Sequence, residues 1–65
     1  MSIGEKIKSL REDNGLSQKE LAEAAEVSRP CIAQYERGTK IPNMVHGKLI
    51  AKTLGCTLDE LAEGV

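Results

Sequence analysis

The sequence predicts an all-α fold in which five short helices form one compact domain over residues 1–65. One observation is that Ser, Thr or Asn precedes the apolar segments, and an oxygen of such a side chain can accept a backbone N–H of a first helical turn. A second is that apolar residues recur three or four positions apart, which is the spacing of one helix face. A third is that Gly15 and Gly55 stand where helices would end.

The first helix is expected to run from about Ser2 to Asp13. Ile3, Ile7 and Leu10 recur at i, i+4 and i+7, so this helix is amphipathic and packs one apolar stripe. The following pair, Asn14-Gly15, tolerates the left-handed conformation in which helices commonly end. We therefore expect the helix to stop there.

The second and third helices are expected to follow each other around a tight turn. Ser17 stands three residues before Glu20, which is the spacing of a capping box, so a helix starts at Ser17. Ser28 marks the next start, and Pro30 falls in the first turn, where a missing N–H has no cost. Because proline disfavours the helical conformation of the residue before it, the cap could instead lie one residue later, at Arg29.

Helical spacing divides these two helices into an inward and an outward face. The inward residues are Leu21, Ala22, Ala25, Ile32 and Tyr35, with Glu36 as a further candidate. The outward residues of the third helix are Arg29, Pro30, Ala33, Gln34 and Arg37. This outward face therefore combines hydrogen-bonding and basic groups with two small apolar contacts.

Asn43 is expected to cap a fourth helix that stops at Gly55. Projection at 100° per residue leaves Val45 and Leu49 pointing outward together. Gly47 weakens this helix by about 1 kcal/mol relative to alanine. The inward group is Met44, Gly47, Ile50, Ala51 and Leu54.

A short closing helix is expected after Thr57, which forms a further capping box with Glu60. Cys56 is positioned to pack on Leu61 as the hydrophobic staple of this helix start. Apolar residues then follow at i, i+3, i+4 and i+7: Leu58, Leu61, Ala62 and Val65.

The overall charge does not by itself favour a nucleic-acid partner. The chain has 9 basic and 10 acidic residues, a net charge of −1 and a pI near 5.8, whereas nucleic-acid-binding domains are commonly basic. Arg29, Arg37 and Lys40 nevertheless cluster on and after the third helix, while Glu60 and Glu63 lie near the carboxyl end. An acidic chain can therefore still carry a basic stripe.

Metal, disulfide and catalytic chemistry find little support in the sequence. Cys31 and Cys56 lie 25 residues apart, and with the single histidine, His46, they do not complete a zinc set. Cys31 with His46 is the only thiol–imidazole pairing, and no glycine-rich phosphate loop accompanies it. We therefore expect no enzyme, no catalytic residue, no metal and no cofactor. We expect His46 to be an exposed third-turn residue without a special role.

No feature of export or membrane insertion is present in the sequence. The amino terminus lacks an apolar signal segment, no stretch approaches membrane length, and the final Glu63-Gly64-Val65 is not a lipidation motif. We expect no membrane partner and a cytoplasmic location.

Four segments together resemble a known family: Ile3–Arg11, Leu16–Ala22, Tyr35–Gly38 and Leu58–Leu61. Each segment alone is weakly specific, but together they are similar to the helix-turn-helix DNA-binding domain of the lambda repressor and Cro type, also called Xre type. The resemblance covers nearly the whole chain and implies a compact five-helix domain. Because this family is widespread in small bacterial and phage regulators, it also implies a bacterial or phage-encoded, nucleoid-associated protein.

Some positions depart from the family pattern. The family usually has glycine at the left-handed turn between the central helices, and Glu26 at this place should cost about 1 kcal/mol. The family commonly has leucine where Gly47 stands, and often at Lys48. Cys31 occupies a position that usually holds Thr or Ser.

The resemblance, together with the chemistry of DNA, predicts contacts to the double helix. The major groove admits one helix, here residues 28–36, whose side chains meet base edges while flanking groups hold phosphates. Arginine can hold guanine O6 and N7, glutamine can hold adenine N6 and N7, and Pro or Ala can touch a thymine methyl. Expected base contacts are Arg29, Pro30, Ala33, Gln34 and, at the start of the preceding helix, Gln18. Expected phosphate contacts are Lys19, Arg37, Thr39, Lys40 and Asn43.

The resemblance also implies a structural ion pair between Arg11 and Glu36, which we expect to be partly buried. In the family an arginine and a glutamate pair at the matching positions. The alternative for such residues is two separately solvated charges, which is common on short helices.

The expected function is sequence-specific binding of double-stranded DNA by a small transcriptional repressor. One helix presents only a half-site, so we expect a weak homodimer that strengthens on an inverted repeat with half-site centres about 10 base pairs apart. Its interface is expected to include Val45, Leu49 and Val65. The alternative is a protein-interaction module of the same fold, for example antitoxin-like, without strong DNA binding. The acidic pI and the outward Val45 and Leu49 favour this alternative.

Overall fold

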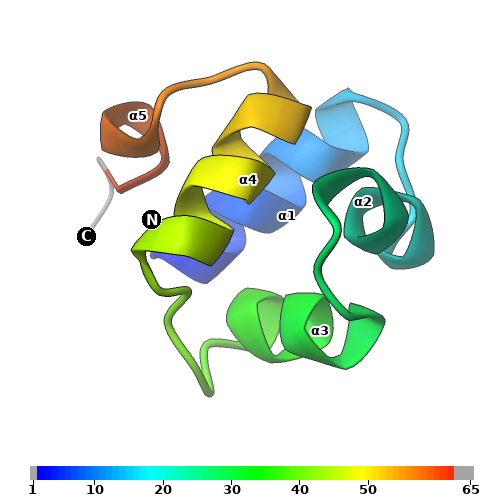
Figure 1. The fold of residues 1–65 in the computed structure, drawn as a ribbon, viewed down its shortest axis with the longest axis horizontal. Helices are drawn as coiled ribbons and strands as arrows, with labels where there is room; N and C mark the ends of the chain where they lie inside the picture. The colour runs from blue at the N-terminus through cyan, green and yellow to red at the C-terminus, as the bar shows by residue number, and fades with distance from the viewer. Residues whose placement is uncertain (1, 63–65) are drawn as a thin grey trace.

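The computed structural model describes residues 2–62, which form five helices and no strand. The helices are α1 (Ile3–Asp13), α2 (Gln18–Ala25), α3 (Arg29–Arg37), α4 (Met44–Leu54) and α5 (Leu58–Ala62) (Figure 1). The predicted all-α, five-helix fold is therefore confirmed, and Val65, an expected interface residue, lies outside the described residues.

Local capping chemistry explains where the helices begin. Ser17 Oγ accepts the backbone N–H of Glu20 at 3.0 Å, and the Glu20 carboxylate accepts the Ser17 N–H at 2.9 Å, which completes the predicted capping box. Ser28 Oγ accepts the N–H of Cys31 at 3.3 Å, so the cap of α3 is Ser28 and not the following residue. Analogous caps begin the other three helices, at Ser2, Asn43 and Thr57.

Ser2 forms a capping box with Glu5 that the sequence analysis did not identify. The Glu5 carboxylate accepts the Ser2 backbone N–H at 3.0 Å, and this hydrogen bond lowers the pKa of Glu5. Local residues also determine where helices end. Helices α3 and α4 both stop at glycines with positive φ, Gly38 at 86° and Gly55 at 76°.

Glu26 ends α2 in the left-handed conformation, with φ 58° and ψ 38°. The N–H of Val27 donates to the carbonyl of Ala22 at 3.0 Å, so the turn closes around Glu26 as it would around glycine. A residue with a Cβ pays about 1–2 kcal/mol in this conformation.

Replacing Glu26 with glycine is therefore expected to raise the free energy of unfolding by a few tenths to about 1 kcal/mol, because relief of strain exceeds the entropic cost of glycine. Urea unfolding measures this change. The matched control is Glu23→Gly, inside the same helix, where glycine should lower stability by up to about 1 kcal/mol. A loss of stability in both variants would contradict the strain argument.

The core is aliphatic, and each helix contributes one large side chain with no exposed surface: Ile7, Leu21, Ile32, Ile50 and Leu61. Smaller residues fill the helix crossings, among them Ala22, Ala25 and Ala51. The single aromatic residue, Tyr35, is 5% exposed. A single aliphatic core thus joins all five helices despite the absence of Phe and Trp.

Two residues of α4 lie differently from the projected faces. Met44 was expected to point inward but is 67% exposed, because it is the first residue of the helix and its side chain leans toward the amino end, beyond the core. Leu49 was expected to point outward but is half-buried and packs against the core. Helix α4 contacts α1, α2 and α5, so more of its circumference is covered than one face.

Ala62, which the i, i+3, i+4 spacing places on the apolar stripe of the closing helix, is exposed at the end of the short α5. The presence of glycine at position 47, where the family commonly has leucine, is explained by packing. A Cβ at Gly47 would lie 2.8 Å from Leu58 Cδ1, so the Leu58 side chain occupies the space that a larger residue in α4 would need.

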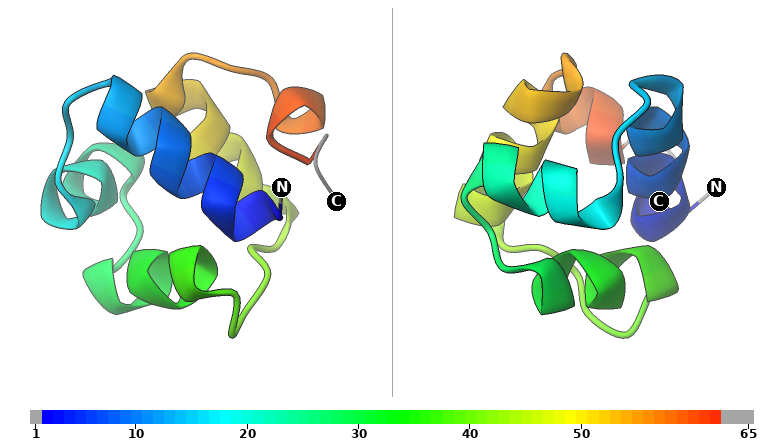
Figure 2. Two further views of the ribbon diagram at one scale, coloured as in Figure 1. Left: turned by 180° about the vertical axis from the view of Figure 1, so that it is seen from behind. Right: turned by 90° about the vertical axis from the view of Figure 1, so that its right-hand side faces the viewer.

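Helices α1 and α3 cross in close contact at Gly4. A Cβ at this position would lie 2.1 Å from the carbonyl oxygen of Tyr35 and 3.1 Å from that of Glu36. Glycine is therefore required where the first turn of α1 rests on the last turns of α3. Helix α3 itself lies along one edge of the molecule in all three views (Figures 1 and 2).

Candidate functional site

The exposed side of α3 carries the residues predicted to form one outward face. Arg29, Pro30 and Arg37 are exposed, while Ala33 and Gln34 are half-buried. Helix α3 lies at the edge of the fold (Figure 2), and we call its outward side, formed by these five residues, the rim of α3. Ile32 and Tyr35 hold the opposite side of the helix in the core.

Residues that flank α3 supply further exposed polar groups. Lys19 lies in the first turn of α2, and Thr39, Lys40 and Asn43 lie in the segment that leads from α3 to α4. Thr39 Oγ1 donates to the carbonyl of Gln34 at 3.3 Å. Asn43 Oδ1 accepts the N–H of His46 at 2.8 Å, so the Asn43 side-chain amide nitrogen remains available to donate to a partner outside the protein.

An ion pair between Arg11 and Glu36 fixes the inner side of α3 to α1. Arg11 Nε lies 2.7 Å from Glu36 Oε2, and the second guanidinium contact reaches Oε1 at 3.2 Å. The two side chains are only 12% and 4% exposed, and the hydrogen bond to Glu36 raises the pKa of Arg11. A third guanidinium N–H donates to the carbonyl of Leu16 at 2.7 Å, so the pair also fixes the entry to α2.

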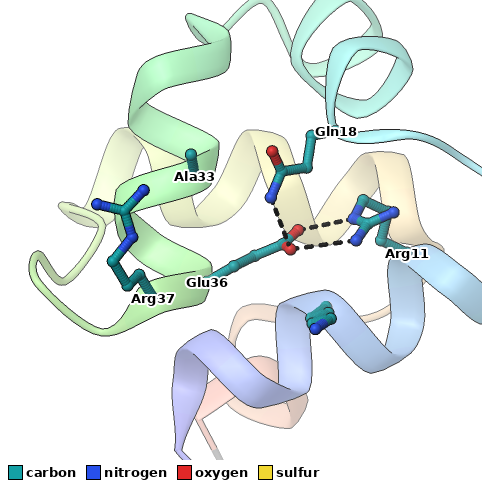
Figure 3. Close-up of a pocket in the computed structure, with 6 residues that line it drawn as sticks. Arg11, Gln18, Ala33, Glu36 and Arg37 are labelled. Carbon is teal, nitrogen blue, oxygen red and sulfur yellow. Dashed lines mark hydrogen bonds and ion pairs between the residues drawn. The ribbon is translucent and has the colours of Figure 1, made fainter.

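Gln18 joins the same network from the start of α2. Its Nε2 donates to Glu36 Oε1 at 3.1 Å (Figure 3). An amide nitrogen carries two N–H groups, so one donor of Gln18 is used internally and one remains. Glu36 therefore sets the positions of Arg11 and Gln18, one on each neighbouring helix.

A surface hollow of about 340 Å³ opens over this network. Its walls come from α1, α2 and α3, and Figure 3 shows the Glu36 side chain reaching across it toward Arg11. The lining residues are Lys8, Arg11, Gln18, Ala33, Glu36 and Arg37. The sequence analysis did not single out Lys8, although it stands three residues before Arg11, the spacing of side chains that share one helix face.

His46 was expected to be an exposed third-turn residue without a role, and this prediction is wrong. It lies in the first turn of α4, is half-buried, and its Nδ1 is 2.6 Å from the hydroxyl of Tyr35. Burial raises the pKa of the Tyr35 hydroxyl, which therefore stays protonated at neutral pH. The hydrogen bond between Tyr35 and His46 ties α3 to the start of α4.

Within residues 2–62, no three His, Cys, Asp or Glu side chains are grouped so as to hold a metal ion. Both cysteines are free thiols, and burial raises the pKa of Cys56. No helix in this part of the chain has the length and apolar character needed to cross a membrane.

A family model described as helix-turn-helix matches residues 7–61. The chain belongs to this family. The match covers α2, α3 and α4 in full and most of α1 and α5. It confirms the resemblance that the four segments indicated.

Curated relatives carry this domain as part of longer chains. The HTH-type transcriptional activator BcrR of Enterococcus faecalis is 42% identical over 64 residues, which is 98% of this chain and 31% of the relative. The HTH-type transcriptional regulator DdrOP3 of Deinococcus deserti is 37% identical over 65 residues, 100% of this chain and 50% of the relative. The chain thus spans between about a third and a half of these relatives.

A solved structure agrees with the fold over its full length. The P22 c2 repressor, solved in complex with a synthetic operator, has a TM-score of 0.93 and 31% sequence identity. The alignment covers 100% of this chain and 98% of that one. The lambda-repressor-like fold predicted from the sequence is therefore confirmed.

Proposed function

We propose that this chain binds double-stranded DNA in a sequence-specific manner, with α3 in the major groove, and regulates transcription. The observation that carries the proposal is the exposed rim of α3, which combines Arg29, Gln34 and two small apolar residues along one helix edge. The P22 c2 repressor, of the same fold, was solved with an operator, which supports this use of the fold. We propose a cytoplasmic protein that acts as a repressor, although one relative is named an activator.

Direct reading of bases is assigned to the rim of α3. Arg29 would donate to guanine O6 and N7 and Gln34 would bond adenine N6 and N7, while Pro30 and Ala33 would contact thymine methyls. Gln18 keeps one amide N–H beyond its hydrogen bond to Glu36, so it would contribute a single donor next to the groove.

Phosphate contacts are assigned to the residues on either side of the rim: Lys19, Arg37, Thr39, Lys40 and Asn43. The acidic overall charge is compatible with this assignment. Asp59 and Glu60 belong to α5, which lies on the far side of the molecule from α3 in Figure 1. Repulsion between α5 and the DNA backbone would therefore be weakened by distance and by salt.

Replacing Arg29 and Lys40 separately tests the division into base and phosphate contacts. Arg29→Ala should cost about 1–3 kcal/mol of binding free energy and relax the preference at one base position, whereas Lys40→Ala should weaken binding to all sequences alike. Both residues are exposed, so neither change should affect folding. The measurement is selection from a random duplex pool, followed by affinities for selected and random duplexes.

Equal losses on selected and random DNA for both variants would remove Arg29 from base reading. Absence of any salt-dependent binding by the unmodified chain would contradict the proposed function as a whole. It would favour the protein-interaction module, which the exposed apolar residues Ile41, Met44 and Val45 would suit.

We also propose that two copies bind together on an inverted repeat, because one α3 reads only a half-site. The exposed large apolar side chains at the start of α4 and in the segment just before it are the basis for the interface. Val45 is 65% exposed and Ile41 75%. Leu49 packs against the core, so it can contribute only the smaller part of its surface that stays exposed.

Val45→Glu is expected to lower the fraction of dimer on a selected duplex, because a carboxylate would be buried in the interface. Sedimentation with and without DNA measures the stoichiometry. Ala24→Glu, which places the same carboxylate at an exposed position of α2, is the control. A stoichiometry that Val45→Glu leaves unchanged would remove Val45 from the interface.

A further inference from the structure

The hollow over the ion pair carries more positive charge than the rest of this acidic chain would suggest. Three cationic side chains, Lys8, Arg11 and Arg37, line it together with one carboxylate, Glu36. Arg11 is already paired with Glu36. Within residues 2–62, no carboxylate lies within salt-bridge distance of Lys8 or Arg37, so two cations remain to face an anion.

The hollow is continuous with the rim of α3 that the proposed function places in the major groove. Ala33 and Arg37 line both the hollow and the rim (Figure 3). Gln18, which lies at the start of α2, closes another side and retains one amide N–H. The edge of a major groove is a row of phosphates, so a group next to α3 and outside the groove would meet the DNA backbone.

We propose that this hollow is a seat for one backbone phosphate of DNA, held between Lys8 of α1 and Arg37 of α3. The inference rests on the proposed function and extends it, because it adds α1 to the DNA-binding surface. Arg37 then contacts the phosphate together with Lys8, from the other side of the hollow, and is not an isolated phosphate contact. Glu36 keeps Arg11 and Gln18 in position at the base of the seat without cancelling the charge of Lys8 and Arg37.

The first experiment measures how the affinity for a selected duplex depends on salt. Each phosphate contact adds about 0.9 to the slope of log affinity against log salt, so between 50 and 200 mM salt the unmodified chain should lose about 3–4-fold more affinity than Lys8→Gln for each copy bound, and about 12-fold more for a pair of copies. Lys52→Gln, at an exposed position of α4 outside the hollow, is the matched control and should keep the full slope. Lys8 is exposed, and an unchanged thermal midpoint verifies that Lys8→Gln folds normally.

The second experiment locates the phosphate. Duplexes carrying one neutral methylphosphonate at successive backbone positions are compared for the unmodified chain, Lys8→Gln and Lys52→Gln. One position should weaken the unmodified chain and Lys52→Gln several-fold and leave Lys8→Gln unaffected, because the partner charge is already absent. Arg37→Gln should lose sensitivity at the same position.

The outcomes separate this inference from the proposed function. If the unmodified chain binds no duplex with salt dependence, the proposed function itself is overturned. If it binds DNA but Lys8→Gln retains the full slope and the same methylphosphonate profile, only the phosphate seat is overturned. Chemical-shift changes at Lys8 with inorganic phosphate, together with that unchanged DNA profile, would assign the hollow to a free anion and overturn the assignment to DNA.

Discussion

Replacing Glu36 with alanine is expected to lower the free energy of unfolding by about 3–5 kcal/mol, because the substitution leaves a buried charge without its partner. Arg11 is only 12% exposed and makes two hydrogen bonds to this carboxylate, at 2.7 and 3.2 Å. Gln18 loses its acceptor as well. Urea unfolding followed by circular dichroism measures the change, and Glu36→Gln provides a milder variant if Glu36→Ala does not fold.

Two further variants control this prediction. Glu23→Ala removes an exposed carboxylate from α2 and should change stability by no more than about 0.5 kcal/mol. The double substitution Arg11→Met with Glu36→Leu removes both charges and should recover much of the loss, because a buried ion pair contributes little beyond an apolar pair of similar volume. A single-variant loss below about 1 kcal/mol would mean that water solvates Arg11 once Glu36 is gone.

Sequence alone was sufficient for the features whose causes are local. Ser17 with Glu20, Ser28, Asn43, and Thr57 with Glu60 mark helix starts because a side chain and an amide three residues away interact directly. Glu26 was assigned a left-handed conformation from the family resemblance, because the family usually has glycine at this turn, and the structure agrees. These interactions do not depend on which helix packs against which.

Features that depend on packing were predicted less well. Arg11 and Glu36 lie 25 residues apart, so only the family resemblance, and no spacing rule, indicated their pairing. His46 contacts Tyr35 because α3 and α4 meet there, which a single-helix projection does not contain. The same projection misplaced Met44, because it ignores that a residue at the first position of a helix can lie beyond the core. It misplaced Leu49, because it assumes that neighbouring helices cover only one face of α4. Lys8 becomes a candidate phosphate contact only because it lines the hollow that three helices enclose.

Replacing Gly4 with alanine should lower the free energy of unfolding by about 1–3 kcal/mol, because the new Cβ would overlap backbone atoms of α3. It would lie 2.1 Å from the carbonyl oxygen of Tyr35, and neither atom belongs to a side chain that can rotate away. Relief therefore requires that α1 move away from α3. Since the same two helices hold Arg11 and Glu36, affinity for a selected duplex should fall as well.

Gly47→Ala is the matched control, because both glycines lie within helices and both substitutions gain helix propensity of up to about 1 kcal/mol. At Gly47 the new Cβ would lie 2.8 Å from Leu58 Cδ1, the end of a flexible side chain that can change rotamer. We therefore expect Gly47→Ala to be close to neutral while Gly4→Ala is clearly destabilising, as measured by urea unfolding under the same conditions. Equal stability of the two variants would show that α1 can shift relative to α3 at little cost, and that the close crossing at Gly4 does not determine how α3 is held.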